Sequence, residues 1–244
     1  NYISVINWPR DEGGFSKWWP GIQLAGKDNL RQQSAMWQAM LMSAGIMPSR
    51  QIFIHGFITS GGTKMSKSLG NVIDPMALVD TYGVDAVRYV LLRHMNPFED
   101  SDLTEENIRE AYTANLVNGL GNLVARVMKL AEDHLPEPVA LTDEDTKVEG
   151  AFFDKMNAYR FNEAMDLIFE HIGKGDEYMT EKEPYKKVKE ESTKAGALAD
   201  IEKLVRHLAK VAAHLVPVMP ATSEAILAAV RENKKPENLF PRID

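Results

Sequence analysis

Gln51-Ile52-Phe53-Ile54-His55 is a nearly continuous apolar run, and it decides how the N-terminal part of the chain is interpreted. Such a run is typical of a β-strand that is buried on both faces. A second apolar run, Ile22 to Ala25, ends at Gly26, and apolar residues recur with helical spacing from Asp28 to Ala44. Strand, helix and strand together predict a βαβ unit with parallel strands.

Two parallel strands do not form a stable sheet by themselves. The sequence opens on Asn1, and residues 1–6 have the apolar character of the interior of a folded element. We therefore expect the rest of the sheet to be supplied by a segment that precedes this sequence.

After Pro75 the pattern becomes helical. Residues 76–93 are predicted to form one helix, and Thr104 followed by two glutamates is a favourable helix start. From Ile108 to Leu130 apolar residues recur every three or four positions, which predicts a long amphipathic helix. Further helices are predicted over roughly 143–172, 184–192, 195–216 and 219–232. The pattern from 104 onward predicts an antiparallel helix bundle.

The composition narrows the function classes. The chain has 244 residues, a net charge of −7 and no cysteine. The absence of cysteine excludes disulfides, cysteine-bound metals and thiol nucleophiles, and it fits a reducing cytoplasm. No apolar run approaches the roughly 20 residues that span a bilayer, so no membrane association is expected. The acidic balance argues against non-specific DNA binding but leaves room for RNA at a local basic patch.

Gly61-Gly62-Thr63-Lys64-Met65-Ser66-Lys67-Ser68-Leu69-Gly70-Asn71 follows the second strand. Loops at the carboxyl ends of parallel strands are where α/β sheets bind ligands. Glycines allow close approach to a phosphate chain, and Lys64 and Lys67 can both reach a polyphosphate. On residue types alone, a solvated lysine–serine loop is the alternative.

Lys64-Met65-Ser66-Lys67-Ser68 is the full KMSKS signature of class I aminoacyl-tRNA synthetases. Gly26-Lys27-Asp28, with Trp37 on the following helix, resembles the methionyl-tRNA synthetase family, and the resemblance extends over essentially the whole chain. It implies the C-terminal half of a Rossmann-type catalytic domain over 1–103, including the KMSKS loop and a connecting stem-contact region. It also implies an all-α anticodon-binding domain over 104–244.

The resemblance implies ligation of L-methionine to tRNA(Met) through methionyl-adenylate, with ATP and Mg²⁺. The family's other ATP-binding signature, of the His-Ile-Gly-His type, does not occur in this sequence. We expect it upstream, so this segment alone would have an incomplete ATP site. A non-catalytic tRNA-binding fragment or paralogue is the alternative, and another class I ligase, of the cysteinyl or leucyl type, is a third hypothesis.

The resemblance also implies site residues. The ATP-binding set is Gly26, Asp28, His55, Gly56, Ile58, Lys64 and Lys67. Lys64 and Lys67 are also the catalytic pair. The methionine-binding set is Tyr2, Asp28, Gln33 and Trp37. No residue is assigned as a metal ligand.

Several of these residues have a purely structural alternative. Asp28 can be a helix N-cap, and His55 a strand-end histidine with satisfied hydrogen bonds. Trp37 can be a residue of the hydrophobic core, and Tyr2 can be a terminal residue without a functional role. Gln33 stands where many family members have a histidine near the methionine sulfur, and its amide can donate to a thioether.

On the long helix, Asn122 and Arg126 lie four residues apart and project together. In the family an Asn-x-x-x-Arg pair on this helix reads anticodon bases. Tyr185 follows Pro184 where the family has a tryptophan that stacks on a base, and a tyrosine can stack as well. A solvated helix face is the alternative interpretation of Asn122 and Arg126.

Overall fold

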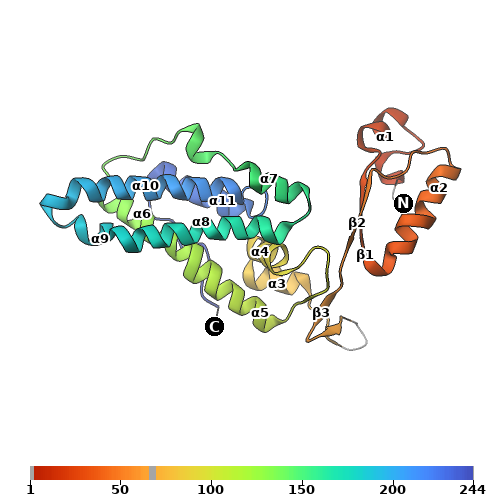
Figure 1. The fold of residues 1–244 in the computed structure, drawn as a ribbon, viewed down its shortest axis with the longest axis horizontal. Helices are drawn as coiled ribbons and strands as arrows, with labels where there is room; N and C mark the ends of the chain where they lie inside the picture. Colours follow the sequence, from red (N-terminus) through yellow and green to blue (C-terminus); the bar gives the residue numbers. More distant parts are fainter. Residues whose placement is uncertain (1–2, 66–69, 244) are drawn as a thin grey trace.

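The computed structural model describes residues 3–65 and 70–243. Figure 1 shows a small α/β part at the N-terminal end of the chain and an elongated helical part, joined through strands β2 and β3. This arrangement matches the predicted order of an α/β part followed by a helix bundle. Helices η1 (Ser4–Ile6) and α1 (Glu12–Trp18) precede the first strand, and Asp11 caps α1 by accepting a hydrogen bond from the Gly14 N–H.

The predicted βαβ unit is confirmed. Strands β1 (Ile22–Gly26) and β2 (Gln51–His55) pair in parallel, with Ile22 opposite Gln51 and Gly26 opposite His55. Their helical connection consists of three segments: η2 (Lys27–Asn29), the π-helix η3 (Gln32–Met36) and α2 (Trp37–Ser43).

The prediction that Gln51–His55 is buried on both faces is wrong. Phe53 is the one residue of β2 that is fully buried, and Leu24 on β1 is 69% exposed. Burial on both faces requires a layer on each side of a sheet. Among the described residues this sheet has two strands and a single crossover connection, so much of its surface remains open.

A second, three-stranded sheet follows β2. Its strands are β3 (Ile58–Ser60), β4 (Thr63–Lys64) and β5 (Ser101–Asp102), in the order β4-β3-β5. β3 and β4 form an antiparallel hairpin, whereas β3 and β5 pair in parallel. The hairpin carries the start of the KMSKS sequence, and β5 lies just before the long helix.

Two predicted helices are interrupted. Residues 76–93 form α3 (Pro75–Tyr82) and α4 (Val84–His94), which are separated by Gly83 with φ +82°. The segment 143–172 contains η6 (Asp143–Thr146) and α7 (Gly150–Asn157), and then a turn at Tyr159 with φ +59° leads into α8 (Phe161–Lys182). Helical φ values are negative, so a residue with positive φ ends the helix.

The long amphipathic helix is confirmed. It consists of α5 (Glu105–Ala111), the π-helical segment η5 (Tyr112–Gly121) and α6 (Asn122–His134). Thr104 caps it as predicted, since its side chain accepts a hydrogen bond from the Asn107 N–H at 3.2 Å. α9 (Pro184–Lys187), α10 (Glu191–Leu215) and α11 (Pro220–Glu232) complete the described helices. Leu116, Leu120 and Leu123 have no exposed surface, so the predicted stripe forms the bundle core.

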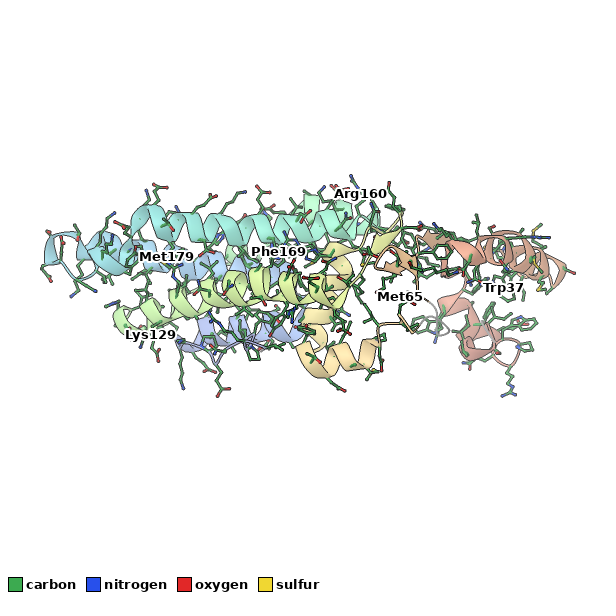
Figure 2. All side chains as sticks on the ribbon, turned by 90° about the horizontal axis from the view of Figure 1, so that it is seen from below. Trp37, Met65, Lys129, Arg160, Phe169 and Met179 are labelled. Carbon is green, nitrogen blue, oxygen red and sulfur yellow. The ribbon has the colours of Figure 1, made fainter. Side chains whose placement is uncertain are left out.

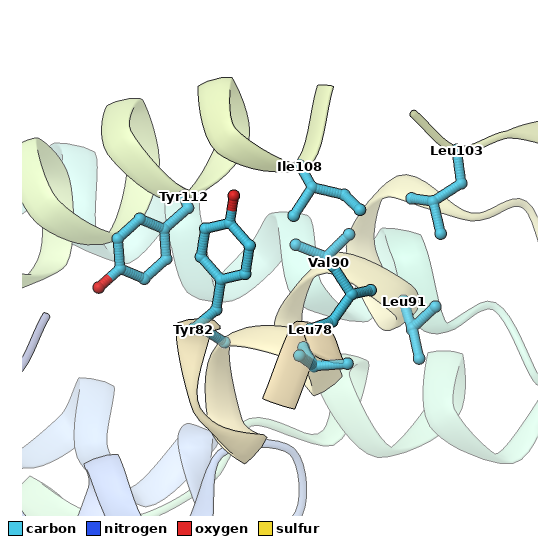
Figure 3. A pocket seen from close by; sticks show the side chains of 9 residues that line it. Leu78, Tyr82, Val90, Leu91, Leu103, Ile108 and Tyr112 are labelled. Atoms are coloured by element: carbon cyan, nitrogen blue, oxygen red, sulfur yellow. The ribbon is translucent and has the colours of Figure 1, made fainter. Parts of the chain in front are cut away.

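Helices α3, α4 and α5 meet in an apolar seam, shown in Figure 3. Tyr82 and Tyr112 contact edge to face there, with ring centroids 5.1 Å apart. The enclosed space is about 10 Å³, which is at the lower limit for one water molecule. The seam is therefore packed core and has no room for a ligand. Because α4 shares the bundle core, the domain division at 103/104 stays a prediction.

Tyr159 links the helical part to the first sheet. Its ring stacks on Phe53 at 4.7 Å, and its hydroxyl donates to Gln51 Oε1 at 3.1 Å. Arg93 of α4 donates to Asp166 of α8 at 3.0 Å and lies over the Phe169 ring.

Across residues 3–65 and 70–243, no helix combines the length and apolar character that crossing a membrane requires.

Candidate functional site

Gly26, Asp28 and His55 lie close together at the carboxyl ends of β1 and β2. A Cβ atom built on Gly26 would approach Asp28 Oδ1 closely, at 3.0 Å, and would lie in ordinary van der Waals contact with His55 Cε1, at 3.6 Å. His55 Nδ1 donates to the Gly56 carbonyl at 2.8 Å, which assigns its proton to Nδ1. Three of the predicted ATP-binding residues are thus brought together from β1, η2 and β2.

Lys64 joins this group from the hairpin. Its ammonium lies 3.5 Å from Asp28 Oδ2 and 4.1 Å from the centre of the Phe57 ring. The side chains of Lys64 and Asp28 are 59% and 50% exposed, and exposed ion pairs contribute only about 0–1 kcal/mol. The ammonium is therefore held at the strand ends by contacts weak enough to be exchanged for a phosphate oxygen. Lys67, the second predicted catalytic lysine, lies outside the described residues.

The structure adds residues to this site that the sequence did not indicate. The Lys27 ammonium lies 4.5 Å from the centre of the same Phe57 ring and pairs with Asp100 at 2.5 Å. Lys27 and Asp100 are 73 positions apart in the chain, so no local pattern connects them. The lysine contact and the Phe57 N–H, which donates to Asp100, hold the pKa of this carboxyl below its usual range.

Gly56 and Ile58 lie at the start of the hairpin. A Cβ atom on Gly56 would lie 2.1 Å from the Glu99 carbonyl oxygen, so this glycine is needed for the close packing of two backbone segments. Ile58 is 37% exposed and pairs with Ser101. Backbone packing explains why residue 56 is a glycine. Contacts of Gly56 and Ile58 with ATP stay a prediction.

Two of the predicted methionine-binding residues, Gln33 and Trp37, lie four residues apart in the helical connection. Gln33 is 9% exposed and belongs to the π-helix η3, whereas Trp37 is half-buried at the start of α2. π-Helical turns inside helices frequently occur at functional sites. Figure 2 shows Trp37 in the α/β part of the chain, distant from the bundle. Tyr2 lies outside the described residues.

The predicted anticodon residues lie together although they come from different helices. Asn122 and Arg126 of α6 share a groove of about 540 Å³ with Tyr185 of α9. Arg126 Nη1 contacts Asp176 Oδ1 at 3.3 Å, and burial raises the pKa of Asp176. The residues that line the groove are Asn122, Ala125, Arg126, Lys129, Leu130, Met179, Tyr185 and Lys235.

Lys129 and Lys235 bring positive charge to this groove, and sequence analysis missed both. Figure 2 shows Lys129 and Met179 at the same end of the bundle, where Met179 lies beneath the surface. Lys129 lies three residues beyond Arg126 on α6 and pairs with Asp133 at 2.6 Å. The spacing of Lys129 from Arg126 on one helix could have indicated that it lies near the groove. Lys235 follows α11, and only the folded path of the chain brings it to the groove.

A separate polar cluster lies inside the bundle. Ligand atoms of Glu149, His171 and His214 all lie within 4.8 Å of one another, a spacing that a metal ion could bridge. However, Lys210 Nζ lies 2.8 Å from Glu149 Oε1, and the Glu149 N–H donates to His214 Nε2 at 3.2 Å. The carboxylate is already neutralised and the imidazole lone pair is already used. The cluster therefore satisfies buried polar groups of the bundle.

An α/β unit with a lysine-bearing hairpin at the ends of its parallel strands, followed by a helix bundle, is the arrangement of class I tRNA synthetases. A family model described as tRNA synthetases class I (M) matches residues 1–128. The methionine–tRNA ligase of Thermotoga maritima is 36% identical over 97% of this chain, and that of Mycobacterium leprae is 36% identical over 93%. The chain belongs to the methionyl family of class I tRNA synthetases.

Solved structures agree with this assignment. Mycobacterium tuberculosis methionyl-tRNA synthetase bound by methionyl-adenylate matches with a TM-score of 0.81 and 30% identity, over 100% of this chain and 53% of that chain. The free-state structure of that enzyme matches with a TM-score of 0.82 and 28% identity, over 54% of its chain. The chain spans 39% of the Thermotoga protein and 45% of the Mycobacterium leprae protein.

Proposed function

We propose that the full-length protein ligates methionine to tRNA(Met) through methionyl-adenylate. The observation that carries the proposal is the position of the Lys64 ammonium, 3.5 Å from Asp28 at the carboxyl ends of the parallel strands. Ligands of α/β sheets bind at such strand ends. A relative with the same fold binds methionyl-adenylate, which adds support from outside the chain. As a ligase that serves translation, the protein is assigned to the cytoplasm.

In the proposed reaction the methionine carboxylate attacks the α-phosphate of MgATP, a new P–O bond forms, and pyrophosphate leaves. Mg²⁺ enters with ATP, on the phosphate oxygens. The substrate supplies the nucleophile, so catalysis consists of positioning and charge stabilisation. Lys64 and Lys67 neutralise the departing pyrophosphate, while Gly26, Asp28 and His55 form the wall against which the nucleotide lies. The methionyl group then passes to the 3′-terminal ribose of the tRNA.

The α6–α9 groove is proposed to bind the anticodon loop. Amide and guanidinium groups suit the edges of unstacked bases, which is how single-stranded RNA loops are read. Asn122 and Arg126 supply these groups, and Tyr185 supplies a ring on which a base can stack. Lys129 and Lys235 can meet the phosphates.

Pyrophosphate exchange by the full-length protein, measured separately with methionine, leucine and cysteine, tests the enzymatic proposal. We expect exchange that depends on methionine. Exchange with another amino acid would reject the specificity. An absence of exchange together with binding of the tRNA would favour the alternative of a non-catalytic tRNA-binding protein.

A further inference from the structure

We propose that Asp102 is a positioning residue that fixes the KMSKS hairpin and joins it to the helix that carries the anticodon residues. This inference rests on the proposed function and adds a role for a residue outside the ATP-binding set. Asp102 belongs to β5, the short strand that precedes the long helix. It acts through the hairpin and does not itself contact the reacting atoms.

Asp102 bonds both to strand β3 and to the turn of the hairpin. Its Oδ1 atom accepts a hydrogen bond from Thr59 Oγ1 at 2.7 Å and another from the Gly62 N–H at 2.9 Å. Thr59 pairs with Lys64 across the hairpin, so the carboxylate is bonded directly opposite that lysine. These two bonds hold the pKa of Asp102 below its usual range, with the Gly62 bond as the larger cause. The carboxylate is therefore an ionised acceptor for the hairpin.

The backbone around Asp102 supports the same contact. The Ser101 N–H donates to the Phe57 carbonyl at 3.0 Å, and the Leu103 N–H donates to the Thr59 carbonyl at 2.8 Å. Leu103 is 5% exposed and belongs to the bundle core. The hairpin is thus bonded to a strand whose next residue is anchored in the bundle.

The same segment also contacts the Lys27 side chain at the end of β1. Asp100, two residues before Asp102, holds the Lys27 ammonium and accepts from the Phe57 N–H at 2.7 Å. The ring of Phe57 in turn carries the Lys64 ammonium. The short segment from Asp100 to Asp102 therefore contacts Lys27, Phe57 and the hairpin.

Asp102 also lies at the start of the long helix. Thr104, two residues later, is the N-cap of α5, and α5, η5 and α6 continue as one helix to Asn122 and Arg126. The long helix and the hairpin are therefore joined through residues 101–104.

Two substitutions of Asp102 in the full-length protein test the role. Asp102→Ala removes both hydrogen bonds, whereas Asp102→Asn keeps an Oδ1 acceptor while a neutral NH2 group replaces Oδ2. The measurement is kcat, with KM for methionine and for ATP, in methionine-dependent pyrophosphate exchange. Asp154→Ala, which removes an exposed carboxylate on α7, is the matched control.

We expect Asp102→Ala to lower kcat by about 10- to 100-fold, because small misplacement of a catalytic group has an effect of this order. KM for methionine should stay within about twofold of the wild-type value, since the methionine-binding candidates lie on another element. Asp102→Asn should recover most of the lost rate, and Asp154→Ala should match wild type. Thr59→Val, which removes one of the two bonds, should lie between the alanine variant and wild type.

The outcomes separate this inference from the proposed function. A wild-type protein without exchange would overturn both. Exchange by wild type with an unchanged kcat in Asp102→Ala would overturn the positioning role alone, and so would an asparagine variant as slow as the alanine variant. If circular dichroism shows that Asp102→Ala is unfolded, the Thr59→Val variant provides the test. A wild-type kcat in that variant would overturn the positioning role.

Discussion

At the scale of single residues, Lys64 shows how a weak contact can serve catalysis. Its ammonium rests between the Asp28 carboxylate and the face of the Phe57 ring, and more than half of its side chain is exposed. Neither contact desolvates the charge, so moving the ammonium to a phosphate oxygen carries little penalty. The site therefore holds a cation ready for a polyphosphate without trapping it.

Lys64→Met in the full-length protein should lower the rate of methionyl-adenylate formation by about 100-fold, as for the removal of other preorganised charge-stabilising groups. Methionine affinity should change little, because Lys64 is proposed to contact phosphates. Rapid-quench measurement of methionyl-adenylate formation in a single turnover gives the rate, and methionine titration gives the affinity. Lys17→Met, on the exposed surface of α1, is the control. Equal losses in rate and methionine affinity would contradict the assigned role.

Arg126 is the residue on which the anticodon proposal depends most. Arg126→Ala should raise KM for tRNA by about 5- to 150-fold, because loss of a guanidinium contact to a base costs about 1–3 kcal/mol. Pyrophosphate exchange without tRNA should stay near the wild-type rate. Arg109→Ala, on an exposed face of the same long helix, provides the comparison. A large exchange defect in Arg126→Ala would remove this residue from anticodon reading.

At the scale of elements, local patterns predicted where helices form more reliably than where they break. Gly83 and Tyr159 interrupt segments whose apolar periodicity continues across them. Periodicity reports which face of a helix is buried, and it persists when two short helices pack against the same core. Gly83 is a local signal for a helix end, since glycine readily adopts positive φ, but the apolar periodicity that continues past it obscured the break. Positive φ at a tyrosine is rare enough that residue type gives no warning of it.

The start of the long helix depends on one side chain, that of Thr104. Thr104→Ala should lower the free energy of unfolding by about 1 kcal/mol, because the Asn107 N–H loses its cap. Thr104→Ser keeps a hydroxyl acceptor and should lose much less. Urea unfolding followed by circular dichroism measures both. An alanine variant as stable as the serine variant would show that the cap contributes nothing here.

At the scale of the whole molecule, buried histidines in the bundle make its stability depend on pH. Burial is the main cause that lowers the pKa of His171 and of His207. Glu149, at 3.3 Å from His171, opposes that shift, while Lys210 and His214 reinforce it. Both imidazoles are therefore neutral in the folded state at neutral pH.

As pH falls below about 6.5, the usual histidine value, the unfolded chain takes up protons before the folded chain does. The stability contributed by these two residues should thus be complete above that value and lost as pH falls through their lowered folded pKa values. Urea unfolding at pH 7.5 and pH 5.5 should show a smaller loss in His171→Gln/His207→Gln than in wild type. His134→Gln, at the end of α6, is the control. An undiminished pH dependence in the double variant would contradict this origin.

The sequence by itself determined the parallel βαβ unit, the capped amphipathic helix, the KMSKS loop and the family. Each of these depends on residue type and spacing within a short window, which is what periodicity and motifs record. The tertiary structure alone brought Asp100 to Lys27, Asp102 to the hairpin, and Tyr159 to Phe53. These pairs are separated by tens of residues, so their proximity follows from how the helices and strands pack against one another, and no local spacing encodes it.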